Sequence, residues 1–600
     1  MCFVHSPFSI FNLPSMPEKQ ETVIKFENFG FQYKVQQKPT LYDINLEIHK
    51  GEKVLIIGGS GSGKSTLINC INGLIPFSYE GTITGSLKIN GKETRDSSIY
   101  QLSKEVGTIL QDSDAQFVGL SVAEDIAFAM ENEAVPRTQM VPVVQAHAAT
   151  VGMQDFLNSI PFDLSGGQKQ KVAIAGVLGS NVDILIFDEP LAALDPKMGE
   201  TAIELIDQLS EEKDRTIIIV EHRLEDVLHK RVDRIVLMAE GHLVADTTPD
   251  ELLKSNLLQE YGIREPLYIT AMKYAGCSLE TNNGLSSIDN LVFSDDNAKR
   301  LHRFFESEVA SAPSLAGDEV INFKDVSFSY EAGKRVLEDV SFSIRKGERI
   351  AVVGKNGAGK STVAKLICGI CTPDSGKITI NNKDSKSLSI KEIGEVVGYV
   401  MQNPNQMIVK DTIKGEVEYA LTLRNFSRED LIKRATDSLN ACSLYPMRNW
   451  PVDTVSYGQK KRITVASILV LQPQVLILDE PSAGQDYRSY TEIMKFLEKL
   501  NKELGIAIVF ITHDMHLALE NTDRAIVFAD GKLVKDDKTF AVLADNSTIQ
   551  KANLKQTSLY KLAQKLGLEP EKVIRHFIDY ERTLKQTQGR DGASEEKANE

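Results

Sequence analysis

The sequence has few cysteines, no long hydrophobic run and no excess of positive charge. Six cysteines among 600 residues are too few for a disulfide framework, so we expect a reducing cytoplasm as the compartment. The longest apolar stretch, residues 465–471 with Ser467 inside it, is far shorter than the roughly 20 residues of a membrane-spanning helix. Lys and Arg number 68 against 83 Asp and Glu, and the net charge of −15 argues against a chain that mainly coats nucleic acid or an anionic membrane.

The rest of the composition is typical of a folded chain with several domains. Hydrophobic residues make up 42% and charged residues 25%, which excludes wholesale disorder. The length predicts roughly three to five compact units. Residues 1–15 are apolar but lack a basic start and contain prolines, which argues against a signal peptide. Because Met16 follows them, we expect a weakly ordered extension or a misassigned start.

The chain contains one unit twice. The segment GGSGSGKST at 58–66 recurs as GKNGAGKST at 354–362, which is 296 residues later. Four further pairs lie 291 residues apart: Gln111 and Gln402, Ser165 and Ser456, Glu189 and Glu480, and His222 and His513. A constant spacing indicates an internal duplication. The expected organisation is an N-terminal extension at 1–21, domains at 22–255 and 319–550 around a linker or appendage at 256–318, and a helical segment with a disordered tail at 551–600.

Short apolar runs alternate with helical patterns inside each unit. Residues 54–57, 184–187 and 217–220 are unbroken apolar runs, typical of parallel strands buried on both faces of a sheet. Each unit then has two apolar runs around a tight-turn dipeptide, Glu240-Gly241 or Asp530-Gly531, which predicts a hairpin. The pattern predicts an α/β fold with a mainly parallel sheet.

Each glycine-rich segment follows an apolar strand and precedes a helix, as a phosphate-binding P-loop does. Glycines let the backbone wrap closely around phosphates, and N–H groups of the loop and helix start point at the anion. Lys64 and Lys360 are expected to reach the β- and γ-phosphates, and Ser65 and Ser361 to ligate Mg²⁺. One such match could be an ordinary glycine-rich turn, but two in the same context favour nucleotide binding.

An acid pair ends an apolar strand in each unit, Asp188-Glu189 in the first and Asp479-Glu480 in the second. The carboxyl end of a strand meets the ligand crevice of an α/β sheet. The aspartate suits Mg²⁺ coordination, and the glutamate can polarise an attacking water. Such a pair alone is more often a helix cap, but it lies 24 residues beyond the same serine in both units, which favours the functional interpretation.

The sequence LSGGQ at 164–168 is the most specific motif of the chain. It is a second anion cradle in a unit that already has one, which is explained if it serves a nucleotide held by the other unit. With these motifs the chain resembles a tandem pair of ABC-type ATPase domains over roughly residues 22–255 and 319–550. The resemblance implies ATP and Mg²⁺ as cofactors, ATP hydrolysis as activity, and pairing of the two units. It also implies that each domain has a mainly parallel sheet core, an antiparallel β portion and a helical subdomain.

The resemblance assigns further residues to the ATP sites. Gln111 and Gln402 resemble the Q-loop glutamine, which contacts Mg²⁺ and senses the transmembrane partner, and His222 and His513 resemble the switch histidine at the γ-phosphate. Tyr33 and Tyr330 resemble the aromatic that stacks on adenine, although strand aromatics are common core residues, and 193–195 resembles the D-loop. The expected catalytic residues are Glu189, Glu480, His222, His513, Gln111 and Gln402. The expected metal ligands are Ser65, Ser361, Asp188, Asp479, Gln111 and Gln402. The expected nucleotide-binding residues are Gly58, Gly59, Ser60, Gly61, Ser62, Gly63, Lys64, Ser65, Thr66, Gly354, Lys355, Asn356, Gly357, Ala358, Gly359, Lys360, Ser361, Thr362, Tyr33, Tyr330, Ser165, Gly166, Gly167, Gln168, Ser456, Gly458 and Gln459.

Departures from the family pattern lie in the second unit. Its signature is VSYGQ, with Tyr457 in place of a glycine, and its D-loop at 483–487 is AGQDY. In the family's head-to-tail arrangement the altered signature serves the nucleotide of the first unit. Both units keep the lysine, glutamate and histidine, so we expect two competent but unequal sites.

Two functions remain open from the sequence: the energy-coupling ATPase of a membrane importer, and a soluble tandem ABC protein that acts on ribosomes. The ribosome-acting subclass joins its units through an arginine-rich arm, but residues 256–318 hold five Lys and Arg against nine Asp and Glu. An acidic arm is unsuited to RNA phosphates.

The segment after the first Q-loop favours the importer. Residues 111–132 and the sequence VEHRLEDV at 220–227 are similar to ATPases of energy-coupling factor (ECF) importers, which take up vitamins and transition-metal ions in prokaryotes. The resemblance implies a peripheral protein on the cytoplasmic face of the cell membrane. Its partners would be an integral coupling subunit and a small substrate-capture membrane protein, with no nucleic acid.

Overall fold

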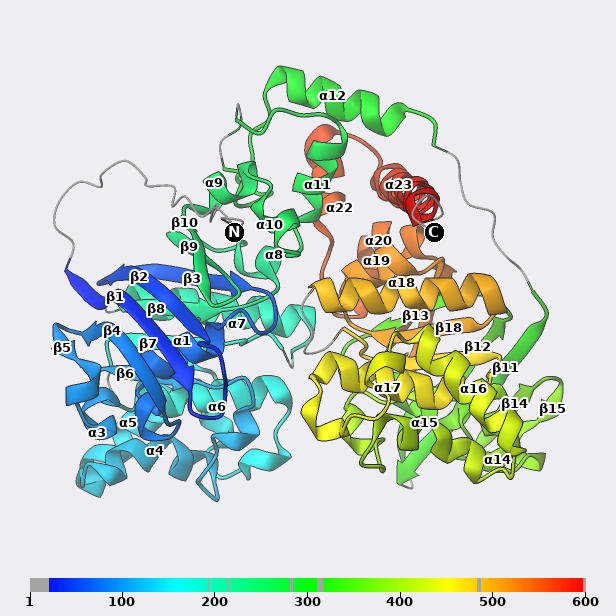
Figure 1. Ribbon diagram of the computed structural model, residues 1–600, viewed down its shortest axis with the longest axis horizontal. Coiled ribbons are helices and arrows are strands. Elements are labelled where there is room, and N and C mark those ends of the chain that lie inside the picture. Colours follow the sequence, from blue (N-terminus) through cyan, green and yellow to red (C-terminus); the bar gives the residue numbers. More distant parts are fainter. Residues whose placement is uncertain are drawn as a thin grey trace, which may run out of the picture. The chain divides into compact units, whose positions relative to one another are not determined.

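The computed structural model describes the chain as two compact units (Figure 1). Unit 1 comprises Met1–Thr270 and Ser278–Ser294, and unit 2 comprises Ala271–Cys277 and Asp295–Glu600. The segment 256–318, expected as a linker or appendage, is therefore divided between the units. The described residues are 21–180, 182–192, 194–212, 215–280, 282, 284–309, 317–331, 333–482 and 487–596.

Unit 1 is built on a six-stranded sheet of β3 (Lys53–Gly58), β6 (Val106–Ile109), β7 (Ile184–Asp188), β8 (Thr216–Val220), β9 (Arg234–Ala239) and β10 (His242–Thr247). The strand order is β10-β9-β3-β8-β7-β6, and only the β9–β10 pair is antiparallel. The predicted runs 54–57, 184–187 and 217–220 lie in β3, β7 and β8 and are fully buried, which confirms them as central strands.

An antiparallel sheet and a set of helices complete unit 1. The sheet has the order β2-β1-β4-β5. Its strands are β1 (Thr22–Tyr33), β2 (Leu41–His49), β4 (Gly81–Ile89) and β5 (Lys92–Glu93). Apolar residues of both sheets and of α1 (Lys64–Ile71) form one core. The helices that follow β6 along the chain, α4 (Val122–Asn132), α5 (Arg137–Thr150) and α6 (Gly166–Leu178), pack on one another as a helical subdomain.

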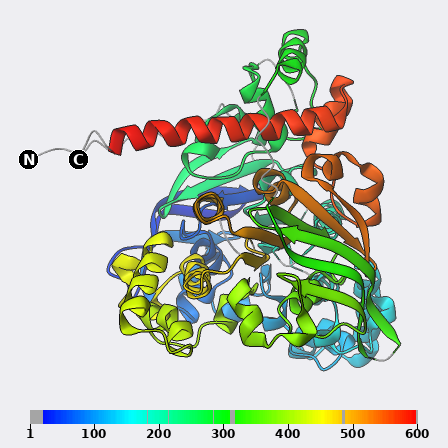
Figure 2. The ribbon, with the colours of Figure 1, turned by 90° about the vertical axis from the view of Figure 1, so that its right-hand side faces the viewer.

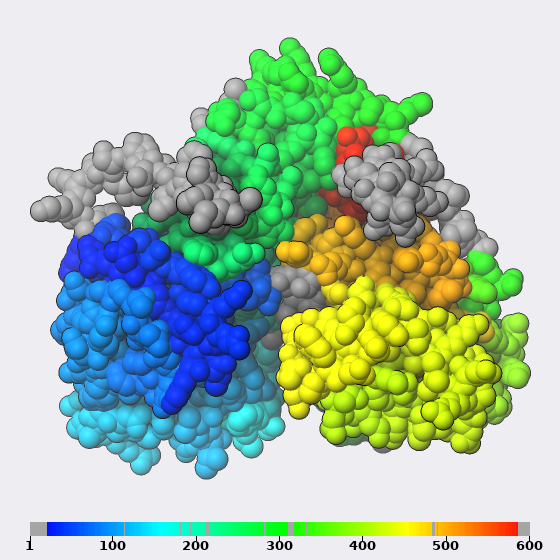
Figure 3. All heavy atoms as spheres, viewed as in Figure 1, coloured from blue at the N-terminus to red at the C-terminus, as the bar shows by residue number. Residues whose placement is uncertain are grey.

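Unit 2 repeats this architecture. Its six-stranded sheet has the order β16-β17-β18-β13-β19-β20, and its antiparallel sheet has the order β12-β11-β14-β15. The strands are β11 (Glu319–Glu331), β12 (Lys334–Arg345), β13 (Arg349–Gly354), β14 (Ser375–Ile380), β15 (Lys383–Asp384), β16 (Val397–Val400), β17 (Val475–Asp479), β18 (Ala507–Thr512), β19 (Arg524–Ala529) and β20 (Lys532–Lys538). The main helices are α13 (Lys360–Ile367), α15 (Ile413–Thr422), α16 (Arg428–Ala441), α17 (Tyr457–Leu469), α18 (Tyr487–Leu504) and α19 (Met515–Asn521). The α16–α17 part of the helical subdomain lies at the surface (yellow in Figure 3).

The fold class predicted from the sequence is confirmed in both units. The two hairpins are also confirmed, since β9 pairs with β10 and β19 with β20. Glu240 and Gly241 have φ of 50° and 81°, and Asp530 and Gly531 have φ of 49° and 77°. Two successive positive φ values are the geometry of a type I′ turn, whose twist matches that of the flanking strands.

Helices from the inter-domain segment and from the C-terminal segment lie together in unit 2. They are the C-terminal half of α11 (Leu267–Tyr274), α12 (Asp295–Glu306), α22 (Ser558–Leu566) and α23 (Pro570–Glu596). Figure 2 shows α23 as one continuous helix, which runs to Glu596 and so into the segment for which we expected a disordered tail. Gln, Lys, Arg, Glu and Ala favour helix, and a helix already started on buried residues is extended at little cost.

The helices of the described residues include none that is long and apolar enough to cross a membrane.

Candidate functional site

The predicted P-loop of unit 1 runs from the end of β3 into the start of α1. Gly63 is the residue before α1 and has φ 100°, and a Cβ at this position would lie 2.8 Å from Leu41 Cδ2. Only glycine fits there without strain. The buried Lys64 folds back over the loop, and its Nζ donates to Gly58 O at 2.8 Å and Gly59 O at 2.9 Å. Backbone N–H groups, the helix start and an ammonium group thus form one anion cradle.

Unit 2 builds the same cradle between β13 and α13. Gly359 has φ 99°, and Lys360 Nζ donates to Gly354 O at 2.7 Å and Lys355 O at 3.0 Å. A predicted adenine-stacking tyrosine lies beside each loop. The hydroxyl of Tyr33 is 3.2 Å from Thr66 Oγ1, and that of Tyr330 is 3.3 Å from Thr362 Oγ1. These contacts place both tyrosines at the first turn of the P-loop helix.

Three predicted catalytic residues of unit 1 meet at one carboxylate. Glu189 directly follows β7, and its Oε2 accepts a hydrogen bond from Gln111 Nε2 at 2.6 Å. Its Oε1 lies 2.7 Å from His222 Nε2. Burial alone would raise the pKa of Glu189, but the hydrogen bond and charge of His222 outweigh it and hold this pKa below its usual range. The carboxylate is therefore held in its charged form.

In unit 2 the glutamate and histidine meet again, but the glutamine does not join them. Glu480 Oε1 lies 2.7 Å from His513 Nδ1, and Glu480 Oε2 accepts a hydrogen bond from Thr512 Oγ1 at 3.3 Å. Within the described part of the chain, the Gln402 side chain makes no hydrogen bond. Instead, Gln402 O accepts a hydrogen bond from the hydroxyl of Tyr457 at 3.2 Å.

The predicted metal ligands of each unit all carry oxygen donors. In unit 2 the Ser361 hydroxyl donates to Asp479 Oδ2 at 3.3 Å, so the two groups are close enough to share one ion. In unit 1, burial and the neighbouring Glu189 raise the pKa of Asp188 to about 6. Hydroxyl, carboxylate and amide oxygens are hard donors, and this chemistry fits Mg²⁺.

Both signature serines cap helices. Ser165 precedes α6 and Ser456 precedes α17, and each accepts a hydrogen bond from the backbone N–H of the glutamine three residues later. That glutamine, Gln168 or Gln459, accepts in return from the serine N–H, which forms a capping box. Tyr457, the first residue of α17, is 37% exposed. Of the predicted D-loops, Ala193 and residues 483–486 lie outside the described residues.

Several residues at these sites were missed from the sequence. Tyr399, on β16, donates its hydroxyl to Asp479 Oδ2 at 2.8 Å. The buried Lys461, on α17, donates to Glu480 O at 2.8 Å and Pro481 O at 3.2 Å. Glu221, buried before His222, accepts from the backbone N–H of Leu191 at 2.9 Å. A comparison of the two repeats could have found them. At the 291-residue spacing Tyr399 aligns with Thr108, Lys461 with Gln170 and Glu221 with Thr512, so at each of these positions the two units carry side chains of different chemistry.

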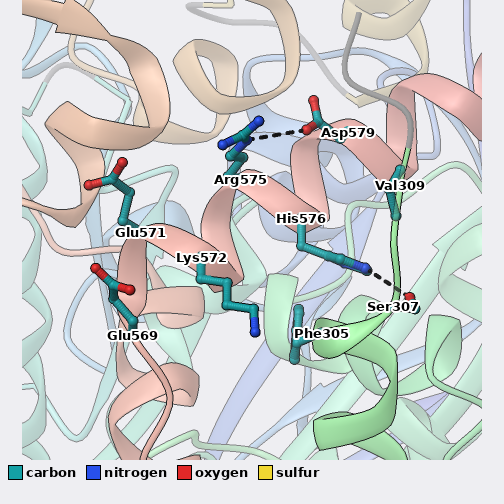
Figure 4. A pocket seen from close by; sticks show the side chains of 9 residues that line it. All are labelled: Phe305, Ser307, Val309, Glu569, Glu571, Lys572, Arg575, His576 and Asp579. Atoms are coloured by element: carbon teal, nitrogen blue, oxygen red, sulfur yellow. Dashed lines mark hydrogen bonds and ion pairs between the residues drawn. The ribbon is translucent and has the colours of Figure 1, made fainter.

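A separate pocket of about 320 Å³ lies in unit 2, between the end of α12 and α23 (Figure 4). Basic and acidic side chains line it together, and Arg575 pairs with Asp579 at 3.7 Å. None of the predicted ATP-site residues lines it. Across the described residues, no group of three or more His, Cys, Asp or Glu side chains is placed to hold a metal ion.

Comparisons with known proteins agree with the two nucleotide sites. The sequence model of the ABC transporter family matches residues 41–192 and 337–483, and a second one, described as "ATP-binding cassette cobalt transporter", matches 255–328. A protein of Clostridium perfringens named as an ABC transporter ATP-binding protein is 53% identical over 94% of this chain and 99% of its own length. Relatives of the same description in Enterococcus faecalis and Vibrio parahaemolyticus are 51% and 50% identical, over 94% and 96% of this chain and 100% and 99% of their own lengths.

A solved structure, cbiO1 from Clostridium perfringens, described as part of the ABC transporter complex cbiONQ, is 31% identical. It covers 41% of this chain and 99% of its own, with a TM-score of 0.37. The family membership rests on the full-length relatives and on the two matched domains. The chain therefore belongs to the ABC transporter ATP-binding proteins, and it is an ATPase with two ABC domains in tandem.

Proposed function

We propose that this chain is the ATP-hydrolysing, energy-coupling subunit of an ECF-type importer that moves a transition-metal ion or a vitamin through separate membrane subunits. Lys64 and Lys360 bind phosphates, and Tyr33 and Tyr330 stack on adenine. Glu189 and Glu480 take a proton from the attacking water. Support for the last role is the contact of each glutamate with a histidine at 2.7 Å.

The oxygen donors of each unit would hold Mg²⁺, which neutralises phosphate charge when it is bound. The ligands we propose are Ser65, Asp188 and Gln111 in unit 1, and Ser361, Asp479 and Gln402 in unit 2. The Ser361–Asp479 distance of 3.3 Å supports the set in unit 2. The signature residues Ser165, Gly166, Gly167, Gln168, Ser456, Gly458 and Gln459 would contact nucleotide through the N–H groups at their helix starts.

The observation that carries the transport proposal is an apolar surface next to the Q-loop of unit 1, here called the Q-loop rim. It consists of the exposed hydrophobic residues Val118, Leu120, Phe128, Ile160 and Phe162. Asp125 fixes its backbone, since Asp125 Oδ1 accepts from Val118 N at 2.9 Å and Gly119 N at 3.1 Å. A cluster of large exposed apolar side chains on an ordered backbone is typical of a protein-binding surface.

Unit 2 has a corresponding rim. Glu416 is buried and accepts from Val409 N at 2.9 Å and Lys410 N at 2.8 Å, as Asp125 does in unit 1. Val409 is exposed and is equivalent to Val118 at the 291-residue spacing, and the exposed Trp450 lies close by, since its carbonyl accepts from Ile413 N at 3.2 Å. The partner we propose for both rims is an apolar segment of an integral coupling subunit, which would hold the chain at the cytoplasmic face of the membrane.

The match of residues 255–328 favours a metal ion over a vitamin as the cargo. The matched family is described as a cobalt transporter. The ATPase subunit need not touch the cargo, so this preference concerns the complex and not a site in this chain. The ribosome-acting alternative is less favoured, because the full-length relatives are named as transporter proteins and the segment 256–318 is acidic.

The experiment is membrane recovery on co-expression with an ECF transmembrane subunit. Leu120→Asp places a charge on a side chain that is 83% exposed in the rim, and we expect it to move most of the chain from the membrane to the soluble fraction. Val292→Asp is the matched control, because Val292 is 69% exposed in unit 1 and lies outside the rim. Full membrane recovery of Leu120→Asp would contradict the docking surface, and salt-sensitive recovery with ribosomes would favour the alternative.

A further inference from the structure

The acid pairs of the two units are held differently, although their strands are in the same register. Tyr399 on β16 lies opposite Ile477 on β17, two residues before Asp479. Its hydroxyl reaches along the sheet and donates to Asp479 Oδ2 at 2.8 Å. The same oxygen accepts from Ser361 Oγ at 3.3 Å. The buried carboxylate of Asp479 is therefore fixed by two hydroxyl groups that come from different elements.

Unit 1 has no equivalent of the tyrosine contact. Thr108 on β6 lies opposite Ile186 on β7, two residues before Asp188, and so occupies the position of Tyr399. Its side chain is too short to reach the carboxylate, and its buried Oγ1 has no hydrogen-bond partner among the described residues. Over the same part of the chain, the Asp188 side chain also accepts no hydrogen bond.

We propose that Tyr399 is a positioning residue for Mg²⁺ binding in unit 2, and that unit 1 lacks this device. The proposal rests on the proposed role of Asp479 as a Mg²⁺ ligand. A hydroxyl that donates to one carboxylate oxygen limits rotation of the group, so its lone pairs are directed before the ion arrives. Groups that orient a metal ligand in this way typically change metal affinity by about 10- to 100-fold when they are removed.

The two units should therefore need different Mg²⁺ concentrations. Unit 2 begins with an oriented carboxylate, whereas unit 1 must order Asp188 during binding. Half-saturation with Mg²⁺ should occur at a lower concentration in unit 2. This inequality arises inside each unit, so it is independent of the altered signature at Tyr457.

The test is a Mg²⁺ titration of fluorescent mant-ATP binding to the full chain, carried out in a Lys64→Ala background so that unit 2 alone binds. Tyr399→Phe removes one hydroxyl and keeps the ring. We expect it to raise the half-saturating Mg²⁺ concentration about tenfold. Nucleotide affinity in EDTA should stay unchanged, because it does not involve the ion, whereas a general change in packing around the site would alter it.

Thr108→Val in a Lys360→Ala background is the matched control, and we expect no shift in its Mg²⁺ dependence because the removed hydroxyl has no partner. Asp479→Asn is the positive control in the Lys64→Ala background. If Asp479→Asn shifts the Mg²⁺ dependence and Tyr399→Phe does not, the inference is overturned while the proposed metal site stands. If Asp479→Asn causes no shift either, the metal assignment fails and the inference fails with it.

Discussion

His513 Nδ1 lies 2.7 Å from Glu480 Oε1, whereas the equivalent contact of unit 1 uses the other ring nitrogen, His222 Nε2. The imidazole ring is thus turned differently against the same carboxylate in the two units. In unit 1 the carboxylate also accepts from Gln111, and in unit 2 it accepts from Thr512. Both units have therefore kept the contact between glutamate and histidine, but the second hydrogen bond to the glutamate comes from a different residue in each unit.

The first prediction concerns Glu480. Glu480→Gln should leave mant-ATP binding unchanged and lower the ATPase kcat at least tenfold, since an amide cannot accept the proton of the attacking water. Steady-state hydrolysis and equilibrium binding on the same preparation measure the two effects. Glu503→Gln, a change on the exposed side of α18, is the control and should hydrolyse ATP normally. An unaltered kcat in Glu480→Gln would remove this residue from the catalytic role.

The second prediction concerns the altered signature. The family resemblance implies that VSYGQ serves the nucleotide of the first unit, and a tyrosine restricts the backbone where a glycine is expected. Closure weaker by about 1.4 kcal/mol would lower occupancy of the closed state roughly tenfold. Glu480→Gln should then cost more activity than Glu189→Gln, and Tyr457→Gly should narrow the difference.

Tyr457→Phe separates the ring from the hydroxyl. The hydroxyl donates to Gln402 O and holds the ring against the Q-loop of its own unit. If this anchoring keeps the ring away from the nucleotide, loss of the hydroxyl should widen the difference between the two glutamate variants. If Glu189→Gln and Glu480→Gln lower ATPase activity equally, and neither change at Tyr457 alters this equality, the two sites close alike.

The strands, hairpins and P-loops could be predicted from the sequence because each depends on neighbouring residues. The burial of 54–57 follows from an unbroken apolar run, and the turn at Glu240-Gly241 follows from its dipeptide. Tyr399 could not be assigned in this way. Its contact with Asp479 depends on the register of β16 against β17, and those strands are far apart in the sequence. The C-terminal end of α23 could not be assigned from its composition either, because polar residues suit both an exposed helix and disorder.

The third prediction concerns the attachment of α23 to unit 2. Arg582 Nη2 donates to Thr522 O at 2.8 Å and pairs with Asp523 at 2.9 Å, and burial lowers the Arg582 pKa. Arg582→Ala leaves the Thr522 carbonyl without this donor, so we expect the free energy of unfolding of unit 2 to fall by about 1–3 kcal/mol. Chemical denaturation measures this. Lys585→Ala, which removes the pair of the half-exposed Lys585 with Glu581 on the same helix, should change stability by less than about 1 kcal/mol. Equal effects would exclude a specific role of Arg582.

The last prediction is a pH dependence caused by Lys461. Burial lowers the Lys461 pKa to about 8, although the carboxylates of Glu480 and Asp479 oppose this. The pKa in the unfolded chain is the ordinary 10.5, so between about pH 8 and 10.5 the unfolded chain binds more protons, and the Lys461 contribution to stability rises with pH.

Lys461→Gln copies Gln170, whose Nε2 donates to Pro190 O at 2.7 Å in unit 1. Relative to this variant, the parent chain should gain roughly 2–3 kcal/mol of unfolding free energy between pH 7 and 10.5. Lys460→Gln, which changes an exposed neighbour, should show the same pH dependence of the unfolding free energy as the parent chain. If the unfolding free energies of the parent chain and Lys461→Gln change equally with pH, the buried amine keeps an ordinary pKa.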